Sequence, residues 1–157
     1  MGSTTERVAV ERKVDIAASP ETVWSFLVDP DKITRWWGTR AEFHPTSGEG
    51  WRVEIAGRNV ARGEILEADP PRRLVYTFGW EAGGNGLPEL LPSGSSVVEF
   101  DLIPTATGTT VRLVHREIPG GELASSHAAG WQHYLGRLAI AAVDGDPGPD
   151  PWATGEM

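Results

Sequence analysis

A single long helical pattern closes the chain after a series of strand patterns, and this order constrains the fold more than any other feature. The helix is predicted to run from about Pro119 or Glu122 to Val143. Steps of three and four residues place one stripe on its buried face, namely His127, Trp131, Tyr134 or Leu135, Leu138 and Ala142. This stripe needs another layer of structure to cover it.

The strand patterns fall into two groups. Residues 7–16 alternate apolar and charged side chains with the period of two that is typical of a half-buried strand. The second group, from about Thr39 to Glu117, contains about six short strands joined by turns. Between the groups, Ser19 and Asp29 each precede a proline and can cap a helix, which predicts two short helices with a break between them.

One segment inside the second group is predicted to be a long mobile loop. Residues 81–95 are rich in Gly and Pro, and their only apolar run, LPELL, is too short to predict a helix. This loop could act as a lid over a pocket.

The predicted order of elements is one strand, two short helices, about six strands and one long helix. Two short helices cannot cover the inner face of such a sheet, so the long helix must lie across it. This predicts an α+β fold in two layers. A strongly curved antiparallel sheet around one long helix tends to leave a gap, and that gap is the predicted ligand cavity.

The composition excludes several classes of protein. The chain has no cysteine, which excludes disulfides, thiolate nucleophiles and cysteine metal sites. Its formal net charge is −8, from 14 Lys and Arg against 22 Asp and Glu, which disfavours a nucleic-acid partner. No apolar run is long enough for a membrane span and the N-terminus lacks a signal-peptide pattern, so a cytoplasmic protein is expected.

One domain is expected over residues 7–143. A disordered N-terminus, residues 1–6, precedes it, and a disordered acidic tail, residues 144–157, follows it. The chain has no Gly-x-Ser-x-Gly elbow, no His-Glu-x-x-His motif and no phosphate-binding glycine loop followed by Lys. No cofactor is therefore expected.

Four segments, in this order, resemble a known family: VDIAASPETVWSFLVDPDKITRWWG, GEILEADPPRRLVYTFGW, TTVRLVHRE and HAAGWQHYLGRL. The chain resembles the bacterial single-domain relatives of the heat-shock-protein-90 ATPase activator. They belong to the SRPBCC superfamily, which also includes START lipid-transfer domains and birch-pollen-allergen-type proteins. The resemblance covers residues 7–143 and implies the helix-grip fold. It implies a shared cavity but no common catalytic motif.

The candidate ligand-binding residues are inward-facing aromatic groups with a few polar side chains among them. Trp131 lies on the helix face that roofs the predicted cavity, and its indole N–H can meet a polar ligand atom. An ordinary core position is an equally good interpretation of Trp131. The full set is Arg12, Trp37, Phe43, Trp51, Tyr76, Phe78, Trp80, Phe100, His115, His127, Trp131 and Leu135.

His115 and His127 are the candidate acid–base groups if the protein is an enzyme. His115 lies on the inward face of the last strand, and His127 is one turn before Trp131. Alternatively, each is a half-buried histidine with a backbone hydrogen bond. No metal site is expected, because His115, His127 and Glu117 include only two histidines and no well-spaced third ligand.

Arg12 falls on the apolar face of the first strand. A charge buried there needs an ion pair, for which Glu117 is the candidate, or water in the cavity, or an anionic ligand.

Three functions follow from these features. The favoured one is a binding or carrier protein for a small hydrophobic or amphipathic molecule with one polar or acidic end. The alternative is a cyclase, dehydratase or hydrolase that uses His115 or His127 as acid–base group and Arg12 to steady an oxyanion. The third is a co-chaperone-like interaction module. In the eukaryotic activators this domain is paired with a client-engaging domain, for which 157 residues are expected to leave no room. A monomer or a homodimer is expected.

Overall fold

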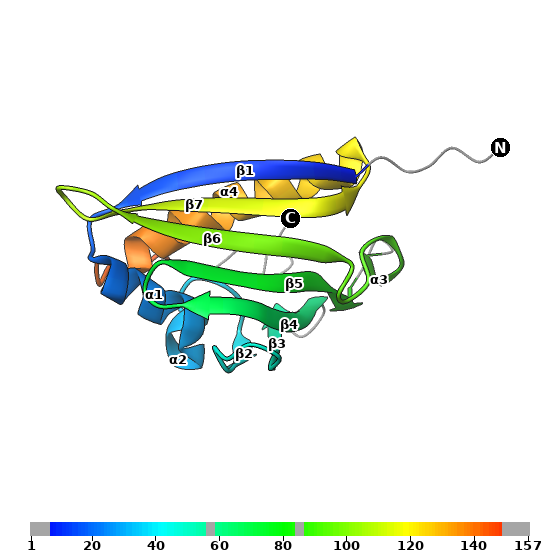
Figure 1. Ribbon diagram of the computed structural model, residues 1–157, viewed down its shortest axis with the longest axis horizontal. Helices are drawn as coiled ribbons and strands as arrows, with labels where there is room; N and C mark the ends of the chain where they lie inside the picture. Colours follow the sequence, from blue (N-terminus) through cyan, green and yellow to red (C-terminus); the bar gives the residue numbers. More distant parts are fainter. Residues whose placement is uncertain (1–6, 56–58, 84–86, 149–157) are drawn as a thin grey trace.

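Seven antiparallel strands form one curved sheet, and a long helix lies against its inner face (Figure 1). The computed structural model describes residues 7–55, 59–83 and 87–148. The strands are β1 (Arg7–Ile16), β2 (Arg40–Phe43), β3 (Gly50–Ile55), β4 (Asn59–Asp69), β5 (Arg73–Ala82), β6 (Ser96–Pro104) and β7 (Thr109–Pro119). The helices are α1 (Pro20–Val28), α2 (Pro30–Ile33), α3 (Leu87–Leu90) and α4 (Gly121–Ala141).

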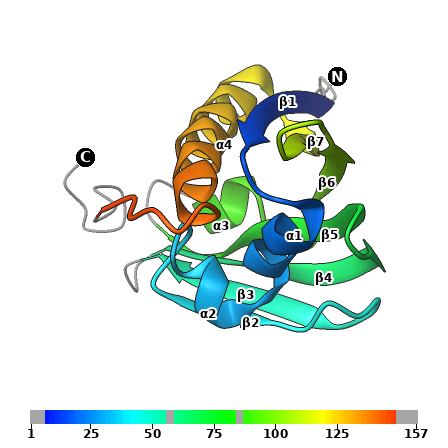
Figure 2. The ribbon, with the colours of Figure 1, turned by 90° about the vertical axis from the view of Figure 1, so that its left-hand side faces the viewer.

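The strand order in the sheet is β1-β7-β6-β5-β4-β3-β2. Figure 2 shows β1, β7 and β6 curving beside α4, while β5, β4 and β3 continue beneath α1 and α2. The two short helices contact β6 and β2, respectively. The predicted α+β, helix-grip architecture is therefore confirmed, with α4 as the helix that crosses the sheet.

Both predicted helix starts are confirmed by their side-chain caps. The Ser19 hydroxyl accepts a hydrogen bond from the backbone N–H of Thr22, and the Asp29 carboxylate accepts one from the N–H of Asp31. Because Pro30 follows at once, α1 ends where α2 begins.

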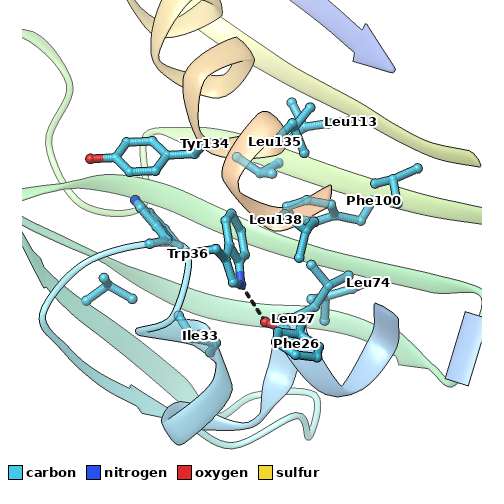
Figure 3. Close-up of a cluster of buried hydrophobic side chains, with 14 of the residues drawn as sticks. Phe26, Leu27, Ile33, Trp36, Leu74, Phe100, Leu113, Tyr134, Leu135 and Leu138 are labelled. Atoms are coloured by element: carbon cyan, nitrogen blue, oxygen red, sulfur yellow. Dashed lines mark hydrogen bonds between the residues drawn. The ribbon is translucent and has the colours of Figure 1, made fainter. Parts of the chain in front are cut away.

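At the break between α1 and α2, a tryptophan side chain supplies a hydrogen bond that the helix backbone lacks. The carbonyl of Phe26 would bond to the N–H four residues later, but Pro30 has no N–H. The indole N–H of Trp36 donates to this carbonyl instead, at 2.8 Å (Figure 3). Trp36 lies beneath Leu135 and Leu138 of α4, so one buried ring joins the helix break to the core.

A bulge in β7 determines which of its residues face the core. Val10 pairs with His115, but Val8 pairs with Ile118, so β7 has one residue more than β1 in this interval. Glu117 lies in this interval, and its left-handed backbone conformation, with a φ of 65°, accommodates the extra residue. His115 and Ile118 are consequently both fully buried, although they are three residues apart.

The second half of the predicted loop is packed against β5 and contains a short helix that its sequence was too short to predict. Leu87–Leu90 form α3, and the backbone N–H of Trp80 donates to the carbonyl of the fully buried Leu91 at 2.8 Å. A side-chain carbon at Gly79 would lie 1.9 Å from the Pro92 carbonyl oxygen, so glycine is required for this approach. The buried leucine anchors a segment whose composition indicates a free loop.

Ion pairs cross the outer face of the sheet from strand to strand. Arg112 of β7 pairs with Glu11 of β1 and lies 3.4 Å from Asp101 of β6, which also pairs with Arg73 of β5 at 2.7 Å. Arg73 lies 3.3 Å from Glu67 of β4 as well. Charged groups therefore occupy the outer face, while the inner face packs against α4 with apolar side chains. Among the helices that the structure describes, none is long and apolar enough to cross a membrane.

The predicted disordered ends lie mostly outside the described residues, which begin at 7 and end at 148. Residues 144–148 follow α4 and touch it. Arg137 donates to the carbonyl of Pro147 at 3.3 Å and to the carbonyl of Trp36 at 3.2 Å. This arginine connects the start of the tail to the α1–α2 region.

Candidate functional site

A cavity of about 200 Å³ lies between α4 and the β3–β5 part of the sheet. The residues that line it are Trp37, Ile55, Asn59, Phe78, Trp80, Leu87, Ser126, His127, Gly130, Trp131 and Tyr134. None of these described residues is Asp, Glu, Lys or Arg. We call this cavity the aromatic pocket.

The walls of the aromatic pocket are rings that contact one another. Trp37 is central, with its ring centroid 5.5 Å from that of Trp131, 6.4 Å from that of Phe78 and 6.5 Å from that of Tyr134. Phe78 also packs edge-on against Trp80, at 5.5 Å. Such offset and edge-on pairs stabilise each ring beyond its burial, so the rings that form the walls support one another.

His115 lies behind Trp131 in a buried chain of hydrogen bonds. The indole N–H of Trp131 donates to Nδ1 of His115 at 3.1 Å. The proton of this imidazole must then be on Nε2, which donates to Ser96 Oγ at 2.8 Å. Ser96 in turn donates to the carbonyl of Phe78 at 2.7 Å. Burial, with a smaller contribution from nearby His127, lowers the pKa of His115 to about 3.

His127 forms a second indole–imidazole pair with the opposite tautomer. Trp80 donates its indole N–H to Nε2 of His127 at 3.1 Å. The proton of this imidazole is therefore on Nδ1, which donates to the carbonyl of Leu123, one turn earlier in α4, at 2.9 Å. Burial lowers the pKa of His127, against the opposing effect of the bond to Leu123. The ring centroids of His115 and His127 are 5.4 Å apart.

The two histidines are close together, as the enzyme hypothesis requires, but neither has a nitrogen available for proton transfer. Both ring nitrogens of each imidazole are engaged by the indole, hydroxyl and carbonyl groups around them. A general acid or base must reach a substrate proton within hydrogen-bonding distance. This arrangement holds two neutral imidazoles in place and gives acid–base catalysis no direct support. Among the described residues, no group of three His, Cys, Asp or Glu side chains is placed to hold a metal ion.

The structure brings some of the predicted ligand-binding residues into the aromatic pocket and places others in the core. Those in the pocket are Trp37, Phe78, Trp80, His127 and Trp131. Those buried in the core outside its lining are Phe43, Trp51, Tyr76, Phe100, Leu135 and His115. The predicted inward face is thus present at every one of these positions, but only part of it borders the cavity.

Arg12 lies outside the lining of the aromatic pocket. It is half-buried on β1, which is an edge strand paired with β7, and its Nη1 donates to the carbonyl of Glu11 at 2.8 Å in an exposed position. The charge of Arg12 is not buried as the sequence pattern indicates, because an edge position lets a long side chain bury its stem and keep its charge in water. Arg12 therefore needs neither Glu117 nor an anionic ligand as a partner.

Sequence reasoning missed six lining residues, which are Ile55, Asn59, Leu87, Ser126, Gly130 and Tyr134. Tyr134 could have been predicted, because the buried stripe of the long helix already included it. Gly130 lies on the same face of α4 as His127 and Tyr134, but it has no side chain that could mark it as an inward-facing position. Leu87 joins the pocket through the anchored α3 segment, for which the composition carries no signal.

Residues 17–142 match the family described as Activator of Hsp90 ATPase homolog 1-like protein. Among curated proteins, none is a significant match to this chain.

Several solved structures share the fold. An AHSA1-like protein from Rhizobium etli, solved by solution NMR, is 42% identical, with a TM-score of 0.73, over 97% of this chain and 92% of that one. A protein from Mesorhizobium loti is 27% identical, with a TM-score of 0.69, over 88% of this chain and 97% of that one. DynU16, a protein in the dynemicin biosynthetic locus, is 25% identical, with a TM-score of 0.73, over 88% of this chain and 48% of that one. Because its family match begins just after β1 and extends through α4, the chain belongs to the Activator of Hsp90 ATPase homolog 1-like family.

Proposed function

We propose that the protein binds a small, uncharged and largely aromatic molecule in the aromatic pocket, and carries or sequesters it. The observation that carries this proposal is the lining itself. Its described residues include Trp37, Phe78, Trp80, Trp131 and Tyr134, and none carries a charged side chain. Ligand sites are typically apolar hollows with a few polar groups, and flat rings stack on flat ligands.

The size of the pocket limits the ligand. About 200 Å³ is below the usual 300–1,000 Å³ range for drug-sized ligands, so a compound with two fused rings is a suitable probe. A long acyl chain would need more room than the described walls leave.

The charge of the pocket limits the ligand further. An ionised carboxylate would lose its hydration there without gaining a cationic partner among the lining residues that the structure describes, which costs several kcal/mol. Arg12, the cation expected to meet an acidic end, donates to the carbonyl of Glu11 outside the pocket. The proposed ligand therefore has a neutral polar group, if it has one at all.

A matched pair of probes tests this function. Equilibrium dialysis at pH 7.5 measures binding of 2-ethylnaphthalene and of 2-naphthoate, which share the same rings but differ in charge. Saturable binding of the neutral probe, with at least tenfold weaker binding of the carboxylate, is expected. The opposite preference, or no binding of either probe, would overturn the proposal.

Two glycines of α4 give a matched pair of variants for the same assay. Gly130 lines the pocket, whereas a side chain at Gly136 would meet nothing within 4 Å. Gly130→Leu is expected to abolish binding of the neutral probe by filling the pocket, and Gly136→Leu is expected to leave it unchanged. Circular dichroism confirms that both variants keep their helix content. Equal loss of binding in the two variants would place the binding site elsewhere.

A further inference from the structure

The tryptophans of this protein differ in what their indole N–H groups bond to. Four of the six in the described residues donate to a protein acceptor. These four bonds run from Trp36 to the Phe26 carbonyl, from Trp51 to the Thr77 carbonyl, from Trp80 to His127 and from Trp131 to His115. Each of these indoles is therefore engaged in holding the fold together.

Trp37 is the exception inside the aromatic pocket. Its side chain is only 5% exposed, and its indole N–H has no hydrogen-bond partner among the described residues. Every fully buried side-chain nitrogen or oxygen in those residues does have a partner. The N–H of Trp37 is consequently reached by solvent, and the aromatic pocket is the cavity that Trp37 borders. Trp24, the other described tryptophan whose indole N–H has no protein acceptor in the described part of the chain, lies in α1 and does not line the pocket.

An indole N–H can only donate, so its partner in a ligand must be an acceptor. The imidazole of His127 is not free to accept a hydrogen bond from Trp37, because its Nε2 already accepts one from Trp80. With no charged group on the described walls, a carbonyl or a similar neutral oxygen suits this donor better than a carboxylate.

We infer that the indole N–H of Trp37 is the polar anchor of the pocket, and that the ligand is an aromatic compound with a carbonyl-type acceptor, such as a ketone or a quinone. This inference rests on the proposed function, and it adds the group that orients the ligand. Trp80 and Trp131 line the pocket with their rings alone, whereas Trp37 lines it and also donates a hydrogen bond to the ligand's oxygen.

The test compares 2-acetylnaphthalene with 2-ethylnaphthalene, which differ in the carbonyl. Equilibrium dialysis gives the dissociation constant of each probe for the wild-type protein and for Trp37→Phe. The ketone is expected to bind the wild type about three- to tenfold more tightly, which is the factor that one neutral hydrogen bond is worth. In Trp37→Phe this preference is expected to disappear. Loss of ring area affects both probes, so the ratio of the two constants isolates the N–H.

The neighbouring tryptophan supplies the control. The indole N–H of Trp36 is used by the Phe26 carbonyl, and Trp36 does not line the pocket, so Trp36→Phe should keep the wild-type ratio.

The outcomes separate the inference from the proposed function. Equal binding of the two probes to the wild type, or a preference that survives in Trp37→Phe, overturns the inference while the pocket remains a binding site. Failure of both probes to bind overturns the proposed function, and the inference with it.

Discussion

The buried imidazole of His115 predicts how the stability of the protein depends on pH. Its pKa is lowered from 6.5 to about 3, mainly by burial. Protonation would also set the indole N–H of Trp131 against an N–H on Nδ1, where it now finds a lone pair. The unfolded chain binds this proton more readily than the native state does, so the free energy of unfolding must fall as the pH is lowered below 6.5.

The size of the effect follows from the two pKa values. One proton difference is worth about 1.4 kcal/mol per pH unit, so His115 alone accounts for a loss of about 2.5 kcal/mol between pH 7.0 and pH 4.5. His127, whose pKa is also lowered by burial, changes stability in the same direction. The pH range excludes most of the contribution of Glu81, whose pKa is lowered from 4.5 mainly by its hydrogen bond from Arg52 and whose contribution is therefore lost mainly below pH 4.5.

Urea unfolding followed by tryptophan fluorescence at pH 7.0, 6.0, 5.2 and 4.5 measures this loss. His115→Asn is the matched variant, because its side-chain oxygen can still accept from Trp131 but does not titrate. The variant is expected to be less stable than the wild type at pH 7.0, and to lose about 2.5 kcal/mol less as the pH falls to 4.5. A wild-type loss below about 1 kcal/mol, or an unchanged pH dependence in the variant, would refute the account of a neutral buried His115.

Three further changes test other parts of the structure. Trp36→Phe should lower the free energy of unfolding by about 1–3 kcal/mol, measured by urea titration, because the Phe26 carbonyl is left without a donor; an unchanged value would show that this bond contributes nothing. Gly136→Ala should raise the free energy of unfolding by about 0.5–1 kcal/mol, since the helix position is open and alanine restricts the unfolded chain; destabilisation would contradict the open position. Arg12→Ala should leave the dissociation constant of 2-acetylnaphthalene within twofold of the wild-type value in equilibrium dialysis, because Arg12 does not line the pocket. Tenfold weaker binding would show that Arg12 contributes to the binding site.

Much of the fold could be predicted from the sequence, because its signals are local. Ser19 and Asp29 precede prolines and cap the helices that they predict, and the stripe of α4 runs as its three- and four-residue spacing indicates. The α+β layers then follow from one long helix and one sheet. The strand order is a matter of tertiary contacts, and for that reason Arg12 was assigned to an inner face without its edge position being known.

The site was predictable only in its large aromatic members. Trp37 and Trp131 stand out by residue type, and both line the pocket. Which rings border a cavity and which are plain core depends on packing across distant strands, so Trp51 and Phe100 could not be distinguished from them. The tautomers of the two histidines depend on which indole each one meets, and no sequence pattern encodes that pairing.

Nuclear magnetic resonance of the indole N–H groups tests the central claim most directly. Each tryptophan gives a separate ¹H–¹⁵N signal, and the Trp37→Phe variant assigns that of Trp37. Titration with 2-acetylnaphthalene should shift the Trp37 signal progressively to a plateau, while the signal of Trp36, whose N–H is bonded to Phe26, stays in place. A Trp37 signal that does not move up to the solubility limit of the probe would contradict binding in the aromatic pocket.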